Sequence, residues 1–146
     1  MIKVLICEDD AITREYLVAV LQMEPEIAAV YEIADGSLAE ERVRDLRPHV
    51  VLMDLRMPVM DGIQATRIIS RRYPEVDVIM LSGETSENSV RDCLMAGAAG
   101  YVSKNAGPDE LISIIKRVHR GEHIGRPALS SDIPHTALGN VGPALA

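Results

Sequence analysis

Short apolar runs alternate with segments of helical periodicity along most of the chain. The apolar runs occupy residues 3–7, 28–33, 50–53, 76–81 and 101–102. The first, third and fourth runs are too short for helices and too uniformly apolar for strands with one exposed face, so they predict buried central strands. The second and fifth runs predict weaker or shorter strands. Strands that alternate with helices in this way are typical of a parallel sheet covered by helices.

The segments between the runs carry apolar residues three and four positions apart, the spacing of a helix with one buried face. In the first segment we expect this face to be formed by Ile12, Tyr16, Leu17, Val20 and Leu21. Asp10 stands where it can cap the start of that helix, and Pro25 lies beyond its end. Further helices are predicted around residues 38–46, 63–69 and 87–95. The last helix has the predicted buried residues Leu111, Ile114, Ile115 and Val118.

The composition favours one domain with an aliphatic core. The chain has 146 residues, of which 47% are hydrophobic but only 3% aromatic. A chain of this length can bury a sizeable core without disulfides or metal. We expect one domain over residues 1–121. Residues 122–146 contain Pro127, Pro134 and Pro143 and have no apolar period, so we expect a linker or flexible tail there.

Charge and targeting signals narrow the class of protein. The formal net charge is −7, which argues against direct nucleic-acid binding by this segment. Cys7 and Cys93 have no paired spacing, so we expect structural thiols in a reducing compartment. No apolar stretch approaches the roughly 20 residues that span a bilayer, and Met1 leads directly into a strand. These features predict a cytoplasmic protein that does not enter the membrane.

Polar residues follow the predicted strands at the point where each strand ends. Glu8, Asp9 and Asp10 follow the first strand, Asp54 the third, Ser82 the fourth and Lys104 the fifth. The carboxyl ends of parallel strands meet along one edge of the sheet, which is where such sheets bind ligands. We therefore expect acids, a hydroxyl group and an amine to converge at this edge.

These residue types together indicate phosphoryl chemistry on a carboxylate. Crowded carboxylates repel one another unless a cation neutralises them, and Mg²⁺ prefers carboxylate and phosphate oxygens. A lysine and a hydroxyl group could hold the other phosphoryl oxygens. Alone, Asp10 is best explained as a helix cap, Ser82 as part of a turn and Lys104 as a surface residue. We keep Asp10 as a cap, because only the other residues gain from their joint position at the strand ends.

Four stretches resemble the receiver domain of two-component response regulators: residues 4–10, 53–62, 81–83 and 100–104. The stretch 53–62 is the most specific, and the others follow in the same order and spacing. The resemblance covers residues 1 to about 121. It implies a doubly wound, flavodoxin-like α/β fold with five parallel strands in the order 2-1-3-4-5.

The resemblance also implies roles for single residues. Asp54 would be the phosphoacceptor, assisted by Lys104 and Ser82. The protein ligands of Mg²⁺, which Mn²⁺ could replace, would be Glu8, Asp9, Asp54 and the backbone carbonyl of Arg56. Ser82 and Tyr101 would form the switch pair. The side chains of Arg56 and Glu84 would tune the lifetime of the phosphorylated state.

Further implications concern the branch of the family and the partners. Many receivers have a cis proline after the lysine, but Asn105 stands here, so we expect a trans peptide bond. Residues 100–121 resemble the NarL/FixJ branch. A sensor histidine kinase would be the phosphodonor, a homodimer could form on phosphorylation, and the output would be transcriptional control through a DNA-binding domain that this chain lacks.

Two other functions are compatible with an aspartyl phosphate or with this fold. Hydrolases of the haloacid dehalogenase type have a second Asp two residues after the nucleophile, whereas Arg56 stands there in this chain. A receiver used for binding alone would have lost residues such as Asp9, Asp54 or Lys104, and all three are present. We therefore expect a switch that assists its own phosphorylation and dephosphorylation rather than an enzyme that turns over a substrate.

Overall fold

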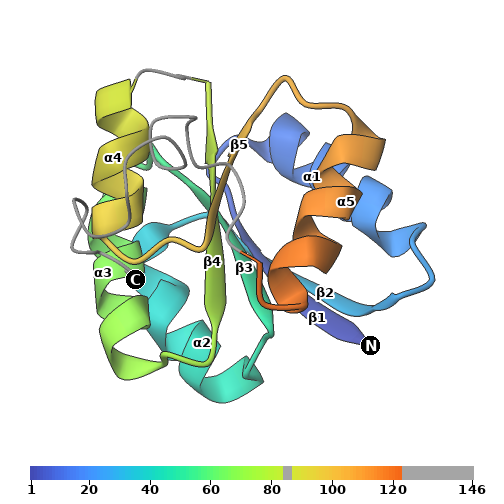
Figure 1. Ribbon diagram of the computed structural model, residues 1–146, viewed down its shortest axis with the longest axis horizontal. Coiled ribbons are helices and arrows are strands. Elements are labelled where there is room, and N and C mark those ends of the chain that lie inside the picture. The colour runs from blue at the N-terminus through green and yellow to red at the C-terminus, as the bar shows by residue number, and fades with distance from the viewer. Residues whose placement is uncertain (84–86, 123–146) are drawn as a thin grey trace.

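The computed structural model describes residues 1–83 and 87–122. A five-stranded sheet crosses its centre in the order β2-β1-β3-β4-β5, and every neighbouring pair is parallel. The strands are β1 Ile2–Cys7, β2 Ile27–Ile33, β3 Val50–Asp54, β4 Asp77–Ser82 and β5 Gly100–Ser103. The predicted fold and strand order are thus confirmed (Figure 1).

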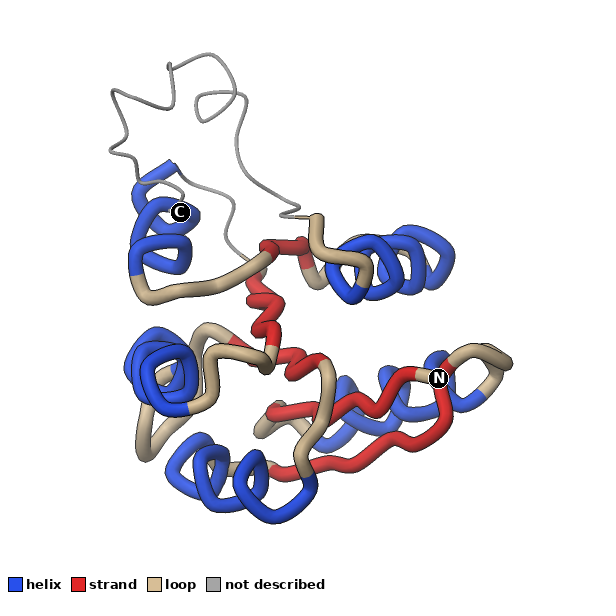
Figure 2. Tube along the Cα trace, turned by 60° about the horizontal axis from the view of Figure 1, so that its bottom comes forward, coloured by secondary structure: helices blue, strands red, loops and turns tan. Residues whose placement is uncertain are grey.

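Helices cover both faces of the sheet (Figures 1 and 2). They are α1 Ala11–Gln22, the short 3₁₀ helix η1 Gly36–Leu38, α2 Ala39–Leu46, α3 Gly62–Arg72, α4 Glu87–Met95 and α5 Pro108–His119. Helices α1 and α5 pack on one face, and α2, α3 and α4 pack on the other.

Each central strand contributes to two apolar layers because its side chains alternate between the faces. In β3, Val51 and Met53 pack toward α2, α3 and α4, whereas Val50 and Leu52 pack toward α1 and α5. All four are fully buried. The core is aliphatic, as the composition predicts, and it fixes the strands whose ends carry the polar residues.

The predicted face of α1 is partly wrong. Leu17 and Leu21 are buried, but Ile12 is 79% and Tyr16 47% exposed. At 3.6 residues per turn, Ile12 and Leu21 point about 180° apart, so the five residues span more of the helix than one packed face can cover. The predicted cap is correct, since the side chain of Asp10 accepts a hydrogen bond of 2.8 Å from the Thr13 N–H.

Other boundaries differ little from the predictions. Leu38 lies in η1 rather than in the following helix, because Asp35 caps η1 through the Ser37 N–H. Cys7 and Cys93 are free thiols and both are buried. Along the described ranges, no helix combines the length and apolarity needed to cross a bilayer. Apart from its first residue, the predicted linker at residues 122–146 lies outside the described residues.

Candidate functional site

The carboxyl ends of the strands bring the predicted polar residues to one edge of the sheet. Asp54 and Ser82 are the last residues of β3 and β4. Backbone pairing continues just beyond these strands, since the Leu55 N–H donates to the Leu81 carbonyl (3.0 Å) and the Lys104 N–H to the Ser82 carbonyl (2.9 Å). The regular sheet therefore extends far enough to fix the residues that follow it.

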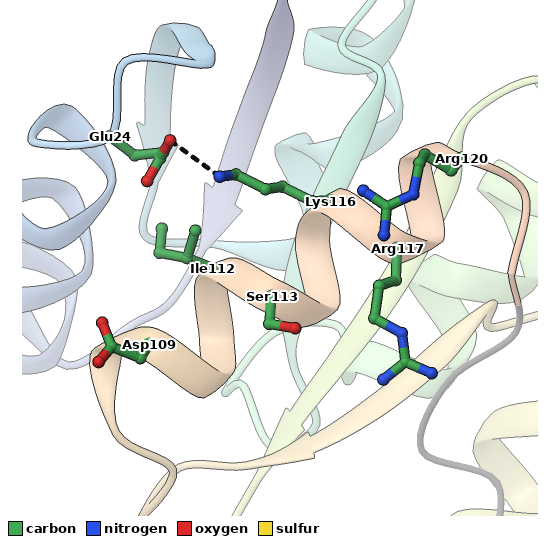
Figure 3. A pocket seen from close by; sticks show the side chains of 7 residues that line it. All are labelled: Glu24, Asp109, Ile112, Ser113, Lys116, Arg117 and Arg120. Atoms are coloured by element: carbon green, nitrogen blue, oxygen red, sulfur yellow. Dashed lines mark ion pairs between the residues drawn. The ribbon is translucent and has the colours of Figure 1, made fainter.

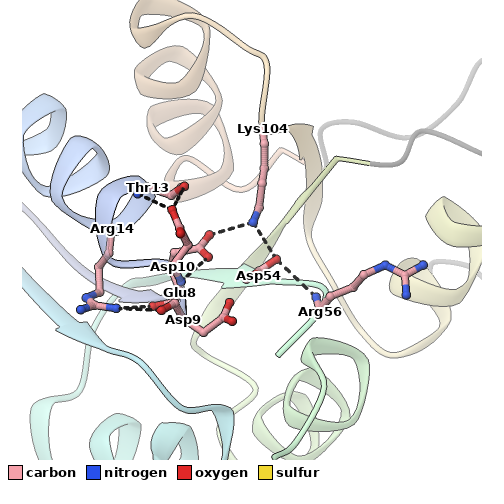
Figure 4. A network of polar contacts seen from close by, with 8 residues as sticks. All are labelled: Glu8, Asp9, Asp10, Thr13, Arg14, Asp54, Arg56 and Lys104. Atoms are coloured by element: carbon pink, nitrogen blue, oxygen red, sulfur yellow. Dashed lines mark hydrogen bonds and ion pairs between the residues drawn. The ribbon is translucent and has the colours of Figure 1, made fainter. Parts of the chain in front are cut away.

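Lys104 bridges two buried carboxylates. Its Nζ atom lies 2.9 Å from Oε1 of Glu8 and 3.1 Å from Oδ1 of Asp54 (Figure 4). Glu8 is fully buried and Asp54 is 3% exposed, whereas the Lys104 side chain keeps 29% exposure. Buried carboxylates need a counter-charge, and Lys104 supplies part of it while remaining accessible from outside.

Asp9 completes a group of three carboxylates. Glu8, Asp9 and Asp54 each offer an oxygen atom, and these oxygens lie within 4.8 Å of one another. Asp9 is exposed, so the group opens to solvent on its side. Three carboxylates against one ammonium group leave negative charge that a hard divalent cation can neutralise, and the donor set fits Mg²⁺ or Mn²⁺.

The protonation of Asp54 is finely balanced. The pKa of Asp54 is raised to about 7, chiefly by burial and also by the negative charge of Glu8, while the hydrogen bond from Lys104 acts to lower it. Burial acts to lower the pKa of Lys104, but its hydrogen bonds to Glu8 and Asp54 outweigh burial and raise it. Lys104 is therefore charged at neutral pH. A cation bound beside Asp54 would favour the ionised, nucleophilic carboxylate.

The loop after Asp54 is held close to the strand by Gly62. The Gly62 N–H donates to the Leu55 carbonyl (2.9 Å), and a Cβ atom at Gly62 would lie 2.2 Å from the Asp54 carbonyl oxygen. The Arg56 N–H also reaches Oδ1 of Asp54 at 3.3 Å. The sequence predicts Gly62 only as part of the motif and not this close approach, although a glycine directly after the helix-capping Asp61 is a signal for it.

The predicted switch and tuning residues lie in different surroundings. Ser82 is 2% exposed and Tyr101 is 6% exposed, so the Tyr101 ring is already buried in this conformation. The Arg56 side chain extends away from Asp54 (Figure 4). Glu84, its predicted partner, lies outside the described residues.

The peptide bond between Lys104 and Asn105 is trans, as expected from the absence of a proline at position 105.

Arg14 is a residue at this site that the sequence alone does not predict. Its Nη1 atom donates to the Glu8 carbonyl at 2.8 Å, directly behind the carboxylate group. An arginine one turn into the helix that follows the acidic pair is the sequence feature that could have suggested it. Its contact with the site is to a backbone carbonyl group, however, and such a group has no sequence signal of its own.

A second hollow lies on the outer side of α5 (Figure 3). It has a volume of about 390 Å³ and is lined by Glu24, Asp109, Ile112, Ser113, Lys116, Arg117 and Arg120. Lys116 is already paired with Glu24 at 3.0 Å and with Glu26 at 2.9 Å. This hollow shares no residue with the carboxylate group, so the strand ends remain the candidate site.

Comparison with known proteins agrees with this geometry. The family model of the response regulator receiver domain matches residues 4–116. The transcriptional regulatory protein DegU of Brevibacillus brevis is 37% identical over 132 residues, which cover 90% of this chain and 56% of DegU. The chain thus spans little more than half the length of that relative.

Two solved structures show the same architecture. A two-component response regulator of the LuxR family from Aurantimonas sp. SI85-9A1 is 28% identical, with a TM-score of 0.82 over 94% of this chain and 99% of the other. The receiver domain of NarL from Mycobacterium tuberculosis is 27% identical, with a TM-score of 0.75 over 83% of this chain and 98% of the other. The likeness to NarL agrees with the branch suggested by residues 100–121.

Proposed function

Because the chain belongs to the response regulator receiver domain family, we propose that it is a phosphorylation-dependent switch of a two-component system with Asp54 as the phosphoacceptor. One observation carries this proposal: a buried carboxylate at a strand end, 3.1 Å from the ammonium group of Lys104 and within a group of three carboxylates. Such a group needs a cation and, with it, can accept a phosphoryl group.

In the proposed reaction, an ionised oxygen of Asp54 attacks the phosphorus atom of a phosphohistidine on a sensor kinase. The P–N bond breaks, the electron pair and a proton go to the departing imidazole, and an acyl phosphate remains on Asp54. Glu8, Asp9, Asp54 and the Arg56 carbonyl would hold Mg²⁺, which supplies positive charge for the phosphoryl oxygens.

Lys104 and Ser82 would bind the transferred group. The Lys104 ammonium group already touches Asp54, so a short movement toward the phosphoryl oxygens lets it stabilise their charge. The Ser82 hydroxyl group can donate to another oxygen. Water would later attack the same phosphorus atom and release inorganic phosphate, so the chain assists both its phosphorylation and its dephosphorylation without turning over a separate substrate.

The output would pass through the Ser82 and Tyr101 pair. A phosphoryl group adds charge and acceptor oxygens that draw the Ser82 hydroxyl group inward, and Tyr101 on β5 would hold its ring in the buried position seen here. The surface formed by α4, β5 and α5 would then favour a homodimer. This chain spans only 56% of DegU. We propose that the dimer acts in the cytoplasm and passes the signal to a DNA-binding domain.

The kinase would dock beside the open side of the site. Ile12 and Tyr16 are exposed on α1, one turn apart. A narrow crevice next to them is lined in part by Tyr16, Lys104 and Leu111. Exposed apolar side chains on the helix that follows the acidic residues, one of them sharing a crevice with Lys104, are suited to a transient protein contact.

Intact-mass analysis after incubation with Mg²⁺ and acetyl phosphate tests the function. We expect one added phosphoryl group on the wild type and none on Asp54→Asn or in the presence of EDTA. Multiple turnover of a phosphoester would favour the hydrolase, and cation binding without any phosphorylation would favour the binding-only receiver. Sedimentation with beryllofluoride tests the dimer, which a monomer at high concentration would contradict.

Arg56 and Glu84 would set the lifetime of the acyl phosphate. If their opposite charges pair across the site, they screen it from water, but an exposed pair contributes only about 0–1 kcal/mol. We therefore expect the double alanine variant to lose phosphate at most about tenfold faster. Equal half-lives at fixed Mg²⁺ would remove both side chains from this role.

A further inference from the structure

Arg14 connects the acidic segment after β1 with the edge strand β2. Its Nη1 atom lies 2.8 Å from the Glu8 carbonyl oxygen and 3.5 Å from that of Asp9. Its Nε atom lies 3.1 Å from Oε1 of Glu32 on β2. The Arg14 side chain is 20% exposed and that of Glu32 is 50% exposed, so the contact with the backbone is the more enclosed part of this arrangement. Figure 4 shows Arg14 beside Glu8 and Asp9.

These contacts lie at a point where the backbone needs support. Strand β1 ends at Cys7, and α1 begins at Ala11, so Glu8 and Asp9 lie between two regular elements. One nitrogen of Arg14, Nη1, faces both carbonyl oxygens, with a short contact of 2.8 Å to that of Glu8 and a longer one of 3.5 Å to that of Asp9. Because Nε of the same planar guanidinium group is held by Glu32, Nη1 has less freedom than the ammonium group of a lysine would have. A restricted backbone at Glu8 and Asp9 also restricts the positions of their Cα and Cβ atoms, and so the positions that their carboxylate groups can reach.

We propose that Arg14 is a positioning residue that orients the carboxylates of Glu8 and Asp9 for the cation, with Glu32 as its anchor. This inference rests on the proposed function for the identity of the cation. The contacts of Arg14 with Glu8 and Asp9 are to their backbone carbonyl oxygens and not to their side chains. Its influence reaches the site through the two backbone carbonyls, in the way that residues behind metal ligands affect affinity.

Mg²⁺ titration by calorimetry on the intact chain tests the proposal. We expect Arg14→Ala to weaken Mg²⁺ binding by about tenfold. We expect Glu32→Gln, which loosens the anchor but keeps the guanidinium group, to weaken it less, and Arg14→Lys to restore it only in part. Phosphorylation by acetyl phosphate should need more Mg²⁺ in Arg14→Ala but reach the wild-type rate at saturation, because Asp54 and Lys104 remain in place.

Arg117→Ala is the matched control. Arg117 pairs with Glu122 at 3.0 Å on the exposed part of α5, so this variant removes an arginine and an ion pair without touching the acidic segment. It should bind Mg²⁺ as the wild type does. Unfolding of each variant by urea without metal separates a loss of stability from a loss of affinity.

Asp9→Asn distinguishes a failure of this inference from a failure of the proposed site. If Asp9→Asn leaves Mg²⁺ binding unchanged, the cation site itself is wrong, and the role of Arg14 falls with it. If Asp9→Asn weakens binding but Arg14→Ala and Glu32→Gln do not, only the positioning role is wrong. Should Arg14→Ala fail to fold, Glu32→Gln and Arg14→Lys decide the question by the same titration.

Discussion

Nζ of Lys104 lies 3.1 Å from Oδ1 of Asp54, the carboxylate that we propose as the phosphoacceptor. The same nitrogen atom lies 2.9 Å from the fully buried Glu8. Lys104 thus has two roles that can be separated by experiment: it offsets buried negative charge in the resting protein, and it would bind the phosphoryl group later.

Replacing Lys104 with methionine should lower the stability of the metal-free protein and slow phosphorylation, but strengthen Mg²⁺ binding. Without the ammonium group, Glu8 and Asp54 repel each other, so we expect the metal-free protein to lose about 1–3 kcal/mol of unfolding free energy. Removal of a positive charge beside the carboxylates should tighten Mg²⁺ binding, while phosphorylation becomes slower. Urea unfolding in EDTA, calorimetry and intact mass measure the three effects. Lys116→Met serves as control, and weaker Mg²⁺ binding in Lys104→Met would contradict the assignment.

Asp54→Asn should stabilise the metal-free protein at neutral and alkaline pH. Burial holds the pKa of Asp54 near 7, above its value of 3.8 in the unfolded chain. Between these values the unfolded chain releases the proton that the folded chain retains, so the contribution of Asp54 to stability falls as pH rises from about 4 to 7. Asparagine cannot ionise, and above pH 7 we expect a gain of about 1–3 kcal/mol.

Urea unfolding at pH 5 and pH 8 in EDTA measures this gain, which should be less than half as large at pH 5 as at pH 8, because pH 5 lies nearer to the pKa of the unfolded chain. Glu75→Gln, a change in an exposed ion pair, is the control. Mg²⁺ should reduce the difference between wild type and variant, because a ligand that binds the folded state stabilises it. A variant less stable than the wild type at pH 8 would show that burial does not penalise the ionised Asp54.

Gly62→Ala should displace the acceptor loop. The new Cβ atom would lie 2.2 Å from the carbonyl oxygen of Asp54, which is backbone and cannot rotate away. We expect a loss of about 1–3 kcal/mol in unfolding free energy and slower phosphorylation at saturating Mg²⁺. Gly107→Ala is the matched control, because a Cβ atom there meets nothing within 4 Å. Equal phosphorylation rates in Gly62→Ala and the wild type would show that the loop absorbs the change.

The sequence predicts the sheet well because the same local pattern, a short apolar run that ends in a polar residue, recurs along the chain. Uniform apolar runs such as residues 50–53 have to be buried on both faces, and the polar residue that ends each run marks the edge of the sheet. The positions of Glu8, Asp54 and Lys104 follow from this pattern and from the strand order. The face of α1 is less predictable, because apolar residues at Ile12 and Tyr16 carry the same local signal whether they are buried or exposed.

Backbone relationships account for the residues that the sequence misses. Arg14 reaches the site through carbonyl groups, which every residue possesses, and its one complementary side chain, Glu32, lies 18 residues away on another strand. The requirement at Gly62 comes from the Asp54 carbonyl, which approaches only after the loop has folded. The motif resemblance includes Gly62 without giving the physical reason for it, and it does not include Arg14. The geometry gives the reason for both residues.

His49 at the opposite end of the sheet should add a separate pH dependence. Its Nδ1 atom accepts a hydrogen bond of 3.0 Å from the Lys3 N–H, and its ring packs edge to face with that of His119, with centroids 5.0 Å apart. Burial lowers the pKa of His49 below 6.5, and the charges of His119 and Lys3 lower it further. Protonation would also remove the acceptor that the Lys3 N–H uses.

As the pH falls from 7 to 5, His49→Asn should therefore lose less unfolding free energy than the wild type. Below pH 6.5 the unfolded chain takes up a proton that folded His49 resists, so this group stabilises the fold at neutral pH and its contribution is lost as pH falls. Because His49 is only half-buried, we expect an effect on the order of 1 kcal/mol between pH 7 and pH 5. Asparagine keeps an acceptor for the Lys3 N–H but does not titrate.

Urea unfolding in EDTA at pH 5, 6 and 7 measures the unfolding free energies of the wild type and of His49→Asn. The difference between them cancels the opposite contribution of Asp54, which both proteins share. His119→Asn should remove only the repulsion between the rings and give a smaller change. If the wild type and His49→Asn lose stability in parallel over this range, protonation of His49 has no part in the acid sensitivity of the fold.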